Sequence, residues 1–377
     1  MSRRVVLHIS GNSYAPLPAA HHTLEIWREL SRGADEYHVI ARAQPGRGAS
    51  HTRLDNIHLH LLPSLWRSQA EFLFTSWTLP YFLIRYRPTL LLAQCPVLGG
   101  LAASACSLVT GVPLMVELHG EHYFRGRATR RLQGLFFREL GRIAIARARR
   151  VRALSQEMLA SIRDTFGARA AAKAVIVPTR VDLSVFGPAK TDYAMGEGLR
   201  LIAVGSFTGP KNHLALIAAL RAANAHASLT LVGEGPLRAQ YEDAIGRLGL
   251  HGRVHLHPWV SQRELAGLLR EHDVYVHYSS TEALARAILE AMAIGLPTVA
   301  TPVGFVRGIL RHGENALLLE QPWAQSLERA LRELRDSTEL RRRLGTAAHS
   351  TIVAEFEWRA VFERYRAALY GMLEAVR

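Results

Sequence analysis

Short apolar runs alternate with longer amphipathic stretches along most of this chain. Val5–Ile9 is the first apolar run, and a stretch with helical periodicity follows near Thr23–Ser31. Similar pairs recur as far as Pro178, and a second series begins at Leu201. A repeated order of strand then helix predicts a mostly parallel sheet with helices on both faces. We therefore predict an α/β protein with two domains, each built on one sheet.

Residues 184–198 separate the two series. They are rich in proline, glycine and polar residues and show no hydrophobic periodicity, as is typical of a connection between domains. We expect the first domain to span residues 1–190 and the second to span residues 191–357. Open α/β sheets bind ligands at the carboxyl ends of their strands, so two such domains facing each other would bind a ligand in a cleft between them.

Two stretches without charge raise the question of a membrane span. Residues 97–116 contain glycines and Pro113, which divide them into a helix of small residues and the start of the strand Leu114–Leu118. Residues 72–84 are too short to cross a bilayer and contain Pro80. We interpret this second stretch as part of the core rather than as an exposed apolar surface.

The net charge of +14 is carried almost entirely by arginine, because the chain has only three lysines. Such a charge favours an anionic membrane surface, a nucleic acid or an acidic substrate as partner. Cys95 and Cys106 provide neither a disulfide framework nor a metal cluster, which fits a reducing compartment. The first residues lead directly into Val5–Ile9, which is too short for a signal peptide. We therefore expect a cytoplasmic protein.

The segment 125–152 is rich in arginine, and apolar residues such as Phe136 and Ile143 lie between the charges. This pattern is typical of a basic amphipathic helix at an anionic membrane surface. A solvated arginine face over an ordinary core helix explains it equally well. The chain shows no aromatic stacking motif and no recognised nucleic-acid module, so we expect no nucleic-acid partner.

The candidate chemistry is concentrated between Tyr278 and Pro297. An apolar run ends there in hydroxyl side chains, and helix-forming composition begins at Ala283. The free N–H groups and the positive dipole end of such a helix would favour a phosphate. Glu282 and Glu290 would lie about 12 Å apart along the helix axis, which excludes a close catalytic pair. They suit a ligand with hydroxyls along its length, such as a nucleotide sugar, although both are also ordinary residues for a helix start and a helix face.

Two further strand-to-helix loops belong to the second domain. Gly205–Asn212 combines a glycine turn with Lys211 before a helix, an arrangement that can hold a phosphate through backbone amides and one positive charge. Gly233–Arg238 follows the next strand, where a tight turn before a proline-started helix is the simpler interpretation. Neither loop is a P-loop or a dinucleotide fingerprint.

Together these motifs resemble the retaining glycosyltransferases of family 4. The resemblance is carried by Gly205–Asn212, by Leu231–Arg238, and by Glu282 followed eight residues later by Glu290-Ala-Met-Ala. It extends from about residue 90 to the end of the chain and is strongest over 200–320. It implies the GT-B architecture of two facing Rossmann-like domains, with a C-terminal helix at about 358–377 packed back on the first. It also implies a nucleotide-sugar donor, retention of configuration and no bound divalent metal.

The same resemblance implies roles for individual residues. Glu290 would bind the donor ribose, and Lys211 would neutralise the donor phosphates. His119, after the strand Leu114–Leu118, and Glu282 would lie at the transferred sugar as the catalytic residues. The donor-binding set comprises Gly205, Ser206, Lys211, Ser279, Ala283, Leu284, Ala285 and Glu290. We expect no metal ligands, since the chain has no carboxylate cluster of the Asp-x-Asp kind.

The chain departs from the family pattern at several positions. Ser206 replaces a usual arginine, Ala283 and Ala285 replace glycines, and Arg307-Gly308 stands where a glutamate is usual. The resemblance predicts an enzyme that transfers a hexose to a glycan or lipid-linked acceptor in surface polysaccharide or glycolipid biosynthesis. Its expected location is the cytoplasm or the inner face of the membrane. The departures leave a non-catalytic nucleotide-sugar or glycan-binding protein on the same fold as the alternative.

Overall fold

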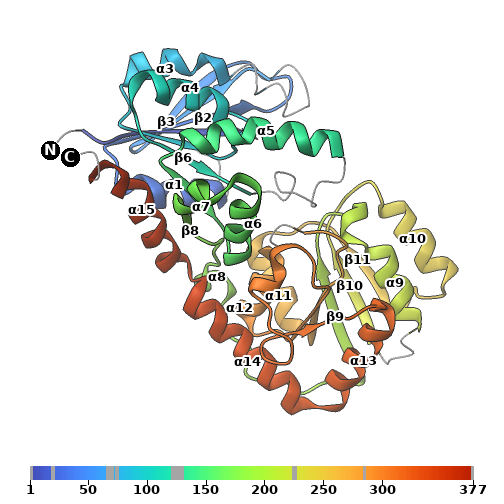
Figure 1. Cartoon of the computed structure of the whole chain (residues 1–377). Helices are drawn as coiled ribbons and strands as arrows, with labels where there is room; N and C mark the ends of the chain where they lie inside the picture. Colours follow the sequence, from blue (N-terminus) through green and yellow to red (C-terminus); the bar gives the residue numbers. More distant parts are fainter. Residues whose placement is uncertain are drawn as a thin grey trace. The chain divides into compact units, whose positions relative to one another are not determined.

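The computed structural model describes residues 3–17, 22–64, 72, 76–119, 131–222, 227–282 and 286–374. The chain forms two compact units (Figure 1). The first comprises the residues up to Pro178 together with those from Phe362 onward, and the second comprises Thr179–Val361. Each unit has its own sheet covered by helices, so the predicted α/β class is confirmed.

The first sheet has the strand order β3-β4-β2-β1-β5-β6-β7-β8. Its strands are β1 (Val5–Tyr14), β2 (Glu36–Ala43), β3 (Ser50–Leu54), β4 (Ile57–Leu62), β5 (Leu90–Ala93), β6 (Leu114–Glu117), β7 (Arg150–Ala153) and β8 (Ala174–Ile176). Strands β3 and β4 form an antiparallel hairpin, and the other described pairs are parallel. The order reverses between β1 and β5, and the carboxyl ends of those strands are therefore where such a sheet binds ligands.

The helices of the first unit include one whose position corrects the interpretation of residues 72–84. They are α1 (His22–Ser31), η2 (Ser76–Thr78), α3 (Leu79–Tyr86), α4 (Gly100–Thr110), α5 (Arg131–Arg147), α6 (Gln156–Phe166), α7 (Ala168–Ala172) and, from Phe362 onward, α15 (Trp358–Glu374). Leu79 and Phe82 of α3 are buried, but Tyr81 and Ile84 are exposed. The assignment of this stretch to the core is thus wrong for one face, because only one side of α3 packs on the protein.

Helix α15 packs on the first unit, alongside α1 (Figure 1). The Tyr365 hydroxyl donates a hydrogen bond to the buried carboxylate of Glu117, which also accepts one of 2.6 Å from Arg152. The Arg152 guanidinium lies 4.6 Å from the centre of the Tyr365 ring. Tyr370 donates to the carbonyl of Leu30 in α1. The helix therefore completes a buried polar network as well as an apolar core.

The second sheet is parallel, with the order β11-β10-β9-β12-β13-β14. Its strands are β9 (Leu199–Val204), β10 (Ala227–Val232), β11 (Val254–His257), β12 (Val274–His277), β13 (Thr298–Ala300) and β14 (Leu317–Leu318). In chain order this is the 3-2-1-4-5-6 arrangement of a doubly wound Rossmann-like sheet, and its switch point lies between β9 and β12.

Helices cover both faces of this second sheet. They are α8 (Leu183–Phe186), η4 (Gly209–Lys211), α9 (His213–Ala222), α10 (Arg238–Arg247), α11 (Gln262–Glu271), α12 (Arg286–Ile294), η5 (Gly304–Gly308), α13 (Trp323–Asp336) and α14 (Thr338–Glu355). Leu201 and Ala203 of β9 belong to one apolar cluster, and Ile202 and Val204 belong to the other. Because both faces are buried, the strands read as continuous apolar runs.

Residues 179–190 are part of the second unit, whereas the sequence pattern predicts a boundary at 190. Val181 is buried and pairs with Glu357, and Phe186 is buried in the same apolar cluster as α11 and α12. The chain therefore enters the second unit before the residues that are rich in proline and glycine. Within the described ranges, no helix combines the length and hydropathy that crossing a bilayer requires.

Candidate functional site

A pocket of about 400 Å³ opens at the carboxyl edge of the second sheet, beside the switch point between β9 and β12. Loops after β9, β11 and β12 and the first turns of α11 and α12 contribute its walls. The lining residues are Val204, Gly205, Ser206, Lys211, Val232, Trp259, Val260, Gln262, Leu265, Glu282, Arg286, Ala287 and Glu290. This volume is within the range of small-molecule sites in proteins.

Glycines allow the loops at this edge to pack closely. A Cβ atom on Gly205 would lie 3.1 Å from the Lys211 side chain, so the lysine stem extends directly over this glycine. A Cβ atom on Gly233 would lie only 2.0 Å from the carbonyl oxygen of Gly205. The Phe207 amide donates to the Glu234 carbonyl across the same two loops. This close backbone approach explains the glycines of the Gly233–Arg238 turn.

Lys211 and Glu282 form an ion pair inside the pocket, in which the lysine ammonium donates to Oε2 of the carboxylate. Both side chains keep about a fifth of their surface exposed, 21% and 16%. The same carboxylate oxygen lies 3.7 Å from Nε2 of His277, too far for a hydrogen bond. Burial, reinforced by Lys211, lowers the pKa of His277 to about 3, so this imidazole is neutral. A bound anion would therefore compete with Glu282 for the charge of Lys211.

Glu290 and Arg286 form a second pair, one helical turn apart on α12. Nε of Arg286 lies 3.2 Å from Oε1 of Glu290. The glutamate side chain is buried, which raises its pKa, and the neighbouring arginine only partly offsets that effect. The arginine is half exposed, at 52%. The pocket thus presents one buried acceptor and one accessible cation beside the first pair.

The remaining predicted donor-binding residues are not part of the described pocket lining. Ser279 is buried, and its carbonyl accepts a hydrogen bond of 2.7 Å from the Thr301 hydroxyl. Ala283, Leu284 and Ala285 lie outside the described residues. Among the predicted set, Gly205, Ser206, Lys211, Glu282 and Glu290 are brought together in this one pocket.

His119 belongs to the first unit, two residues after the end of β6. Its Nε2 lies 3.1 Å from Oε2 of Glu117, and 41% of its side chain is exposed. Burial opposes ionisation of Glu117, but Arg152 and His119 together hold its pKa well below the usual range. The contact with this carboxylate orients the imidazole of His119.

Sequence reasoning missed three polar or aromatic side chains of the pocket: Trp259, Gln262 and Arg286. Arg286 lies four residues before Glu290, and this helical spacing could have revealed it. Trp259 and Gln262 follow β11, and only the strand order brings that loop to the pocket. Trp259 is 52% exposed, which leaves a large aromatic surface available to a ligand.

Two protein-family profiles match this chain. The profile described as Glycosyltransferase Family 4 matches residues 19–185, and the one described as Glycosyl transferases group 1 matches residues 195–351. The second match contains every residue that lines the pocket.

A curated relative supports the same family. The lipopolysaccharide core biosynthesis glycosyltransferase LpsD of Rhizobium meliloti is 32% identical over 165 residues, which cover 44% of this chain and 47% of LpsD. The match thus spans about half the length of that relative.

Solved structures share the fold over the whole chain. Sucrose-phosphate synthase from Thermosynechococcus elongatus superimposes with a TM-score of 0.82 at 19% identity, covering 100% of both chains. HepE of Anabaena, solved in complex with UDP and glucose, gives a TM-score of 0.75 at 17% identity and covers 97% of this chain and 99% of HepE. Together the two profiles span most of the chain. With the shared fold, they show that this chain belongs to the group 1, family 4 glycosyltransferases, which are transferase enzymes with the GT-B fold.

Proposed function

We propose that this protein is an active, retaining glycosyltransferase that moves a hexose from a nucleotide-sugar donor to a glycan or lipid-linked acceptor. Surface polysaccharide or glycolipid biosynthesis is the process that we assign to it, because the relative LpsD is named for lipopolysaccharide core biosynthesis. The observation that carries the proposal is the pocket at the switch point of the second sheet. There Lys211, Glu282, Arg286 and Glu290 line a single cavity.

The proposed donor position follows from the chemistry of these side chains. Two cations, Lys211 and Arg286, would bind the diphosphate, and the buried acceptor Glu290 would bind the ribose hydroxyls. The exposed ring of Trp259 offers a stacking surface for the base. When the diphosphate draws the charge of Lys211, Glu282 is released to accept hydrogen bonds from the sugar hydroxyls. Arg286 would thus supply the positive charge that the family places at the position of Ser206.

The reaction separates charge, and the proposed roles follow that separation. Negative charge grows on the departing diphosphate, and a preorganised lysine and arginine stabilise it. Positive charge grows on the sugar ring, where Glu282 would stabilise it. We propose His119 of the first unit as a second catalytic residue, on the resemblance to the family's first-domain histidine. We expect transfer to proceed in the presence of EDTA, because the pocket already holds two cations for the phosphates.

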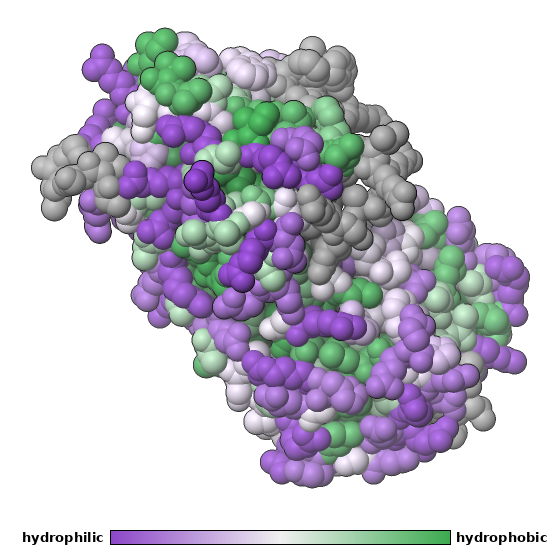
Figure 2. Space-filling model, viewed as in Figure 1, coloured by the Kyte–Doolittle hydropathy of each residue, from purple (hydrophilic) through white to green (hydrophobic). Residues whose placement is uncertain are grey.

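We also propose that the first unit contacts an anionic membrane from the cytoplasmic side. Figure 2 shows hydrophobic side chains gathered over this unit near α3 and α5. Large exposed apolar residues on η2, α3, α4 and α5 are Trp77, Tyr81, Ile84, Leu108, Val109, Leu135, Phe136 and Ile143. Helix α4 packs against both α3 and α5, so these residues belong to neighbouring elements. Helix α5 carries more arginine than Glu139 can neutralise, which favours anionic lipid.

Vesicle sedimentation tests the membrane contact. The purified protein should pellet with vesicles that contain anionic phospholipid and much less with neutral ones. Ile84→Asp should weaken this binding, whereas Val353→Asp, at an exposed apolar position of the second unit, should not. If Ile84→Asp pelleted with anionic vesicles as completely as the wild type and Val353→Asp do, that result would contradict the proposed surface.

Incubation with UDP- and GDP-sugars tests the enzymatic proposal, with and without lipid-linked and glycan acceptors. We expect transfer, or slow donor hydrolysis without acceptor, for at least one donor. Calorimetric binding of a donor without turnover on any acceptor would support the non-catalytic alternative. Absence of both binding and turnover across the panel would remove the proposal.

A further inference from the structure

Four histidines lie side by side at one edge of the first sheet, in the unit that does not contain the pocket described above. His38 of β2 is opposite His58 of β4, and His51 of β3 is opposite His60 of β4. The rings stack across the strands, with centroids 4.6 Å apart for His38 and His58 and 4.5 Å apart for His51 and His60. His58 and His60 are two residues apart, which places them on the same face of a strand.

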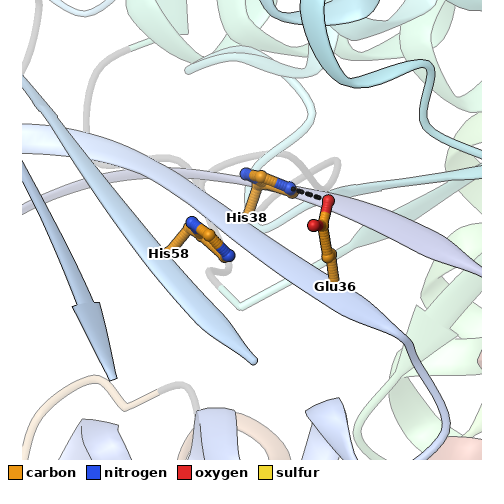
Figure 3. A group of neighbouring side chains, drawn as sticks. All are labelled: Glu36, His38 and His58. Atoms are coloured by element: carbon orange, nitrogen blue, oxygen red, sulfur yellow. Dashed lines mark hydrogen bonds and ion pairs between the residues drawn. The ribbon is translucent and has the colours of Figure 1, made fainter. Parts of the chain in front are cut away.

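Glu36 lies beside two of these histidines, and together the three residues form a set of possible metal ligands. Figure 3 shows Glu36 and His38 on β2 and His58 on the neighbouring strand β4. One ligand atom from each residue lies within 4.8 Å of the other two. Nε2 of His38 is already 3.1 Å from Oε2 of Glu36. Ligand atoms around a tetrahedral zinc ion are about 3.4 Å apart at bond lengths of about 2.0–2.1 Å, so closure needs a small movement of one imidazole.

The protonation states of these groups suit metal binding. Nε2 of His58 is buried and has no hydrogen-bond partner among the described residues, so its polar atom is unsatisfied. Burial lowers the pKa of His58 to about 4 and also lowers that of His38, so both imidazoles are neutral near pH 7. Burial opposes ionisation of Glu36, but its contacts with His38 and Arg3 lower its pKa. Each group is therefore in the form that binds a cation.

The other two histidines hold the candidate ligands in place. Nδ1 of His38 lies 3.0 Å from Nε2 of His60, and Nδ1 of His58 lies 3.4 Å from Nε2 of His51. Hydrogen bonds of this kind to the second ring nitrogen orient metal-bound imidazoles in proteins. The ring of Tyr86 on α3 packs 4.0 Å from the His38 ring, which further restricts its rotation.

We propose that Glu36, His38 and His58 bind a divalent transition-metal ion, with water completing the coordination. Two imidazoles and one carboxylate are a set that zinc accepts and that magnesium or calcium disfavours. Arg3 also contacts Glu36 and would compete for one carboxylate oxygen, while Oε2 faces His38. Glu36 is the first residue of β2 and His58 the second of β4, so the site lies at the amino edge of the sheet. The ion would therefore stabilise the edge hairpin and would not take part in sugar transfer, and this proposal is independent of the proposed function.

Zinc titration of the whole tag-free protein, stripped with EDTA and dialysed, tests the site. The wild type should bind one more equivalent of Zn²⁺ by calorimetry than Glu36→Gln or His58→Gln. The matched control is His255→Gln, which removes an exposed histidine of β11 and should keep the full stoichiometry. His51→Gln, which removes only an orienting contact, should keep the stoichiometry but weaken binding by about tenfold.

Circular dichroism and a thermal melt without metal confirm that each variant is folded before titration. Zn²⁺ should raise the Tm of the wild type and of His255→Gln, and it should have a smaller effect on Glu36→Gln and His58→Gln. Equal zinc stoichiometry and equal thermal shifts in the wild type and both ligand variants would overturn the proposal.

Discussion

Lys211 and Glu282 neutralise each other in the structure, although sequence reasoning assigned them to different parts of the ligand. The two side chains line a pocket, where each keeps part of its surface exposed, so water partly screens their attraction. A diphosphate carries more charge than one carboxylate, so it can take over the lysine at little cost. On the proposed function, the pair would position both side chains before the donor arrives and would release Glu282 when the donor binds.

Glu290→Gln tests the ribose contact at the scale of one residue. The change keeps the shape of the side chain but removes an ionised acceptor, so the donor KM should rise about tenfold or more with a smaller effect on kcat. Burial raises the pKa of this carboxyl, so folding should not suffer when the charge is removed. Steady-state kinetics at saturating acceptor measure the effect, and an unchanged donor KM would remove the proposed ribose role.

Arg286→Ala tests whether this residue supplies the phosphate charge that Ser206 lacks. Loss of a charge-assisted contact should raise the donor KM by about tenfold. The double variant Ser206→Arg with Arg286→Ala should recover much of the affinity, because both positions line the same pocket. Arg247→Ala, at an exposed position of α10, is the control. A double variant as weak as Arg286→Ala alone would show that the two positions do not serve the same phosphate.

At the scale of elements, the sequence predicted those strands that are buried on both faces. Their continuous apolar runs are visible without knowledge of their neighbours. Strand β3 was not predicted, because Ser50–Leu54 alternates between partly buried and exposed residues and has no apolar run. Its pairing with β4 depends on a turn at Asp55, which has a positive φ of 54°. His51 joins the histidine row only through this pairing, whereas His38 and His58 face each other because β2 pairs with β4. Neither pairing leaves a local signal in the sequence, so the row was missed.

The candidate pocket was predictable to the same extent. Lys211, Glu282 and Glu290 lie at strand ends or at helical spacing, which a pattern reveals. The contribution of Trp259 depends on the order of strands in the sheet, and the pairing of Lys211 with Glu282 depends on how two loops pack. Such contacts between distant parts of a chain leave no local periodicity.

The packing of α15 can be tested through its buried polar contacts. Tyr365→Phe removes a hydrogen bond to the buried Glu117 and should cost about 1–3 kcal/mol of unfolding free energy. Arg152→Met leaves that carboxylate without its cation and should cost about 3–5 kcal/mol. Arg332→Met, which breaks an exposed pair on α13, should cost less than about 1 kcal/mol. Urea denaturation followed by circular dichroism measures all three, and equal losses would contradict this ranking.

For the whole molecule, buried neutral histidines make stability depend on pH. Burial lowers the pKa of His8 and His213 to about 4 and that of His277 to about 3. In the unfolded chain these groups titrate near pH 6.5. Below that pH the unfolded state binds protons that the folded state excludes, so each group costs about 1.4 kcal/mol per pH unit until its folded pKa is reached. The Tm should therefore fall steadily between pH 7 and pH 5.

Differential scanning calorimetry at constant ionic strength measures this fall. His213→Phe should reduce the slope, because His213 is buried against the rings of Phe207 and Tyr241 and its Nδ1 has no partner within the described part of the chain. A Tm that stays constant from pH 7 to pH 5 would show that these imidazoles are already protonated in the folded state.

The return of α15 to the first unit sets the order in which the units complete folding during synthesis. All residues of the second unit, Thr179–Val361, leave the ribosome before Tyr365 and Tyr370 do. On nascent chains stalled just after residue 361 has emerged, a protease should spare the second unit and still cut the first. The first unit is thus synthesised first but completes its folding last. Until α15 packs, the surfaces of α1, β6 and β7 that it covers remain exposed on the nascent chain and available to a chaperone.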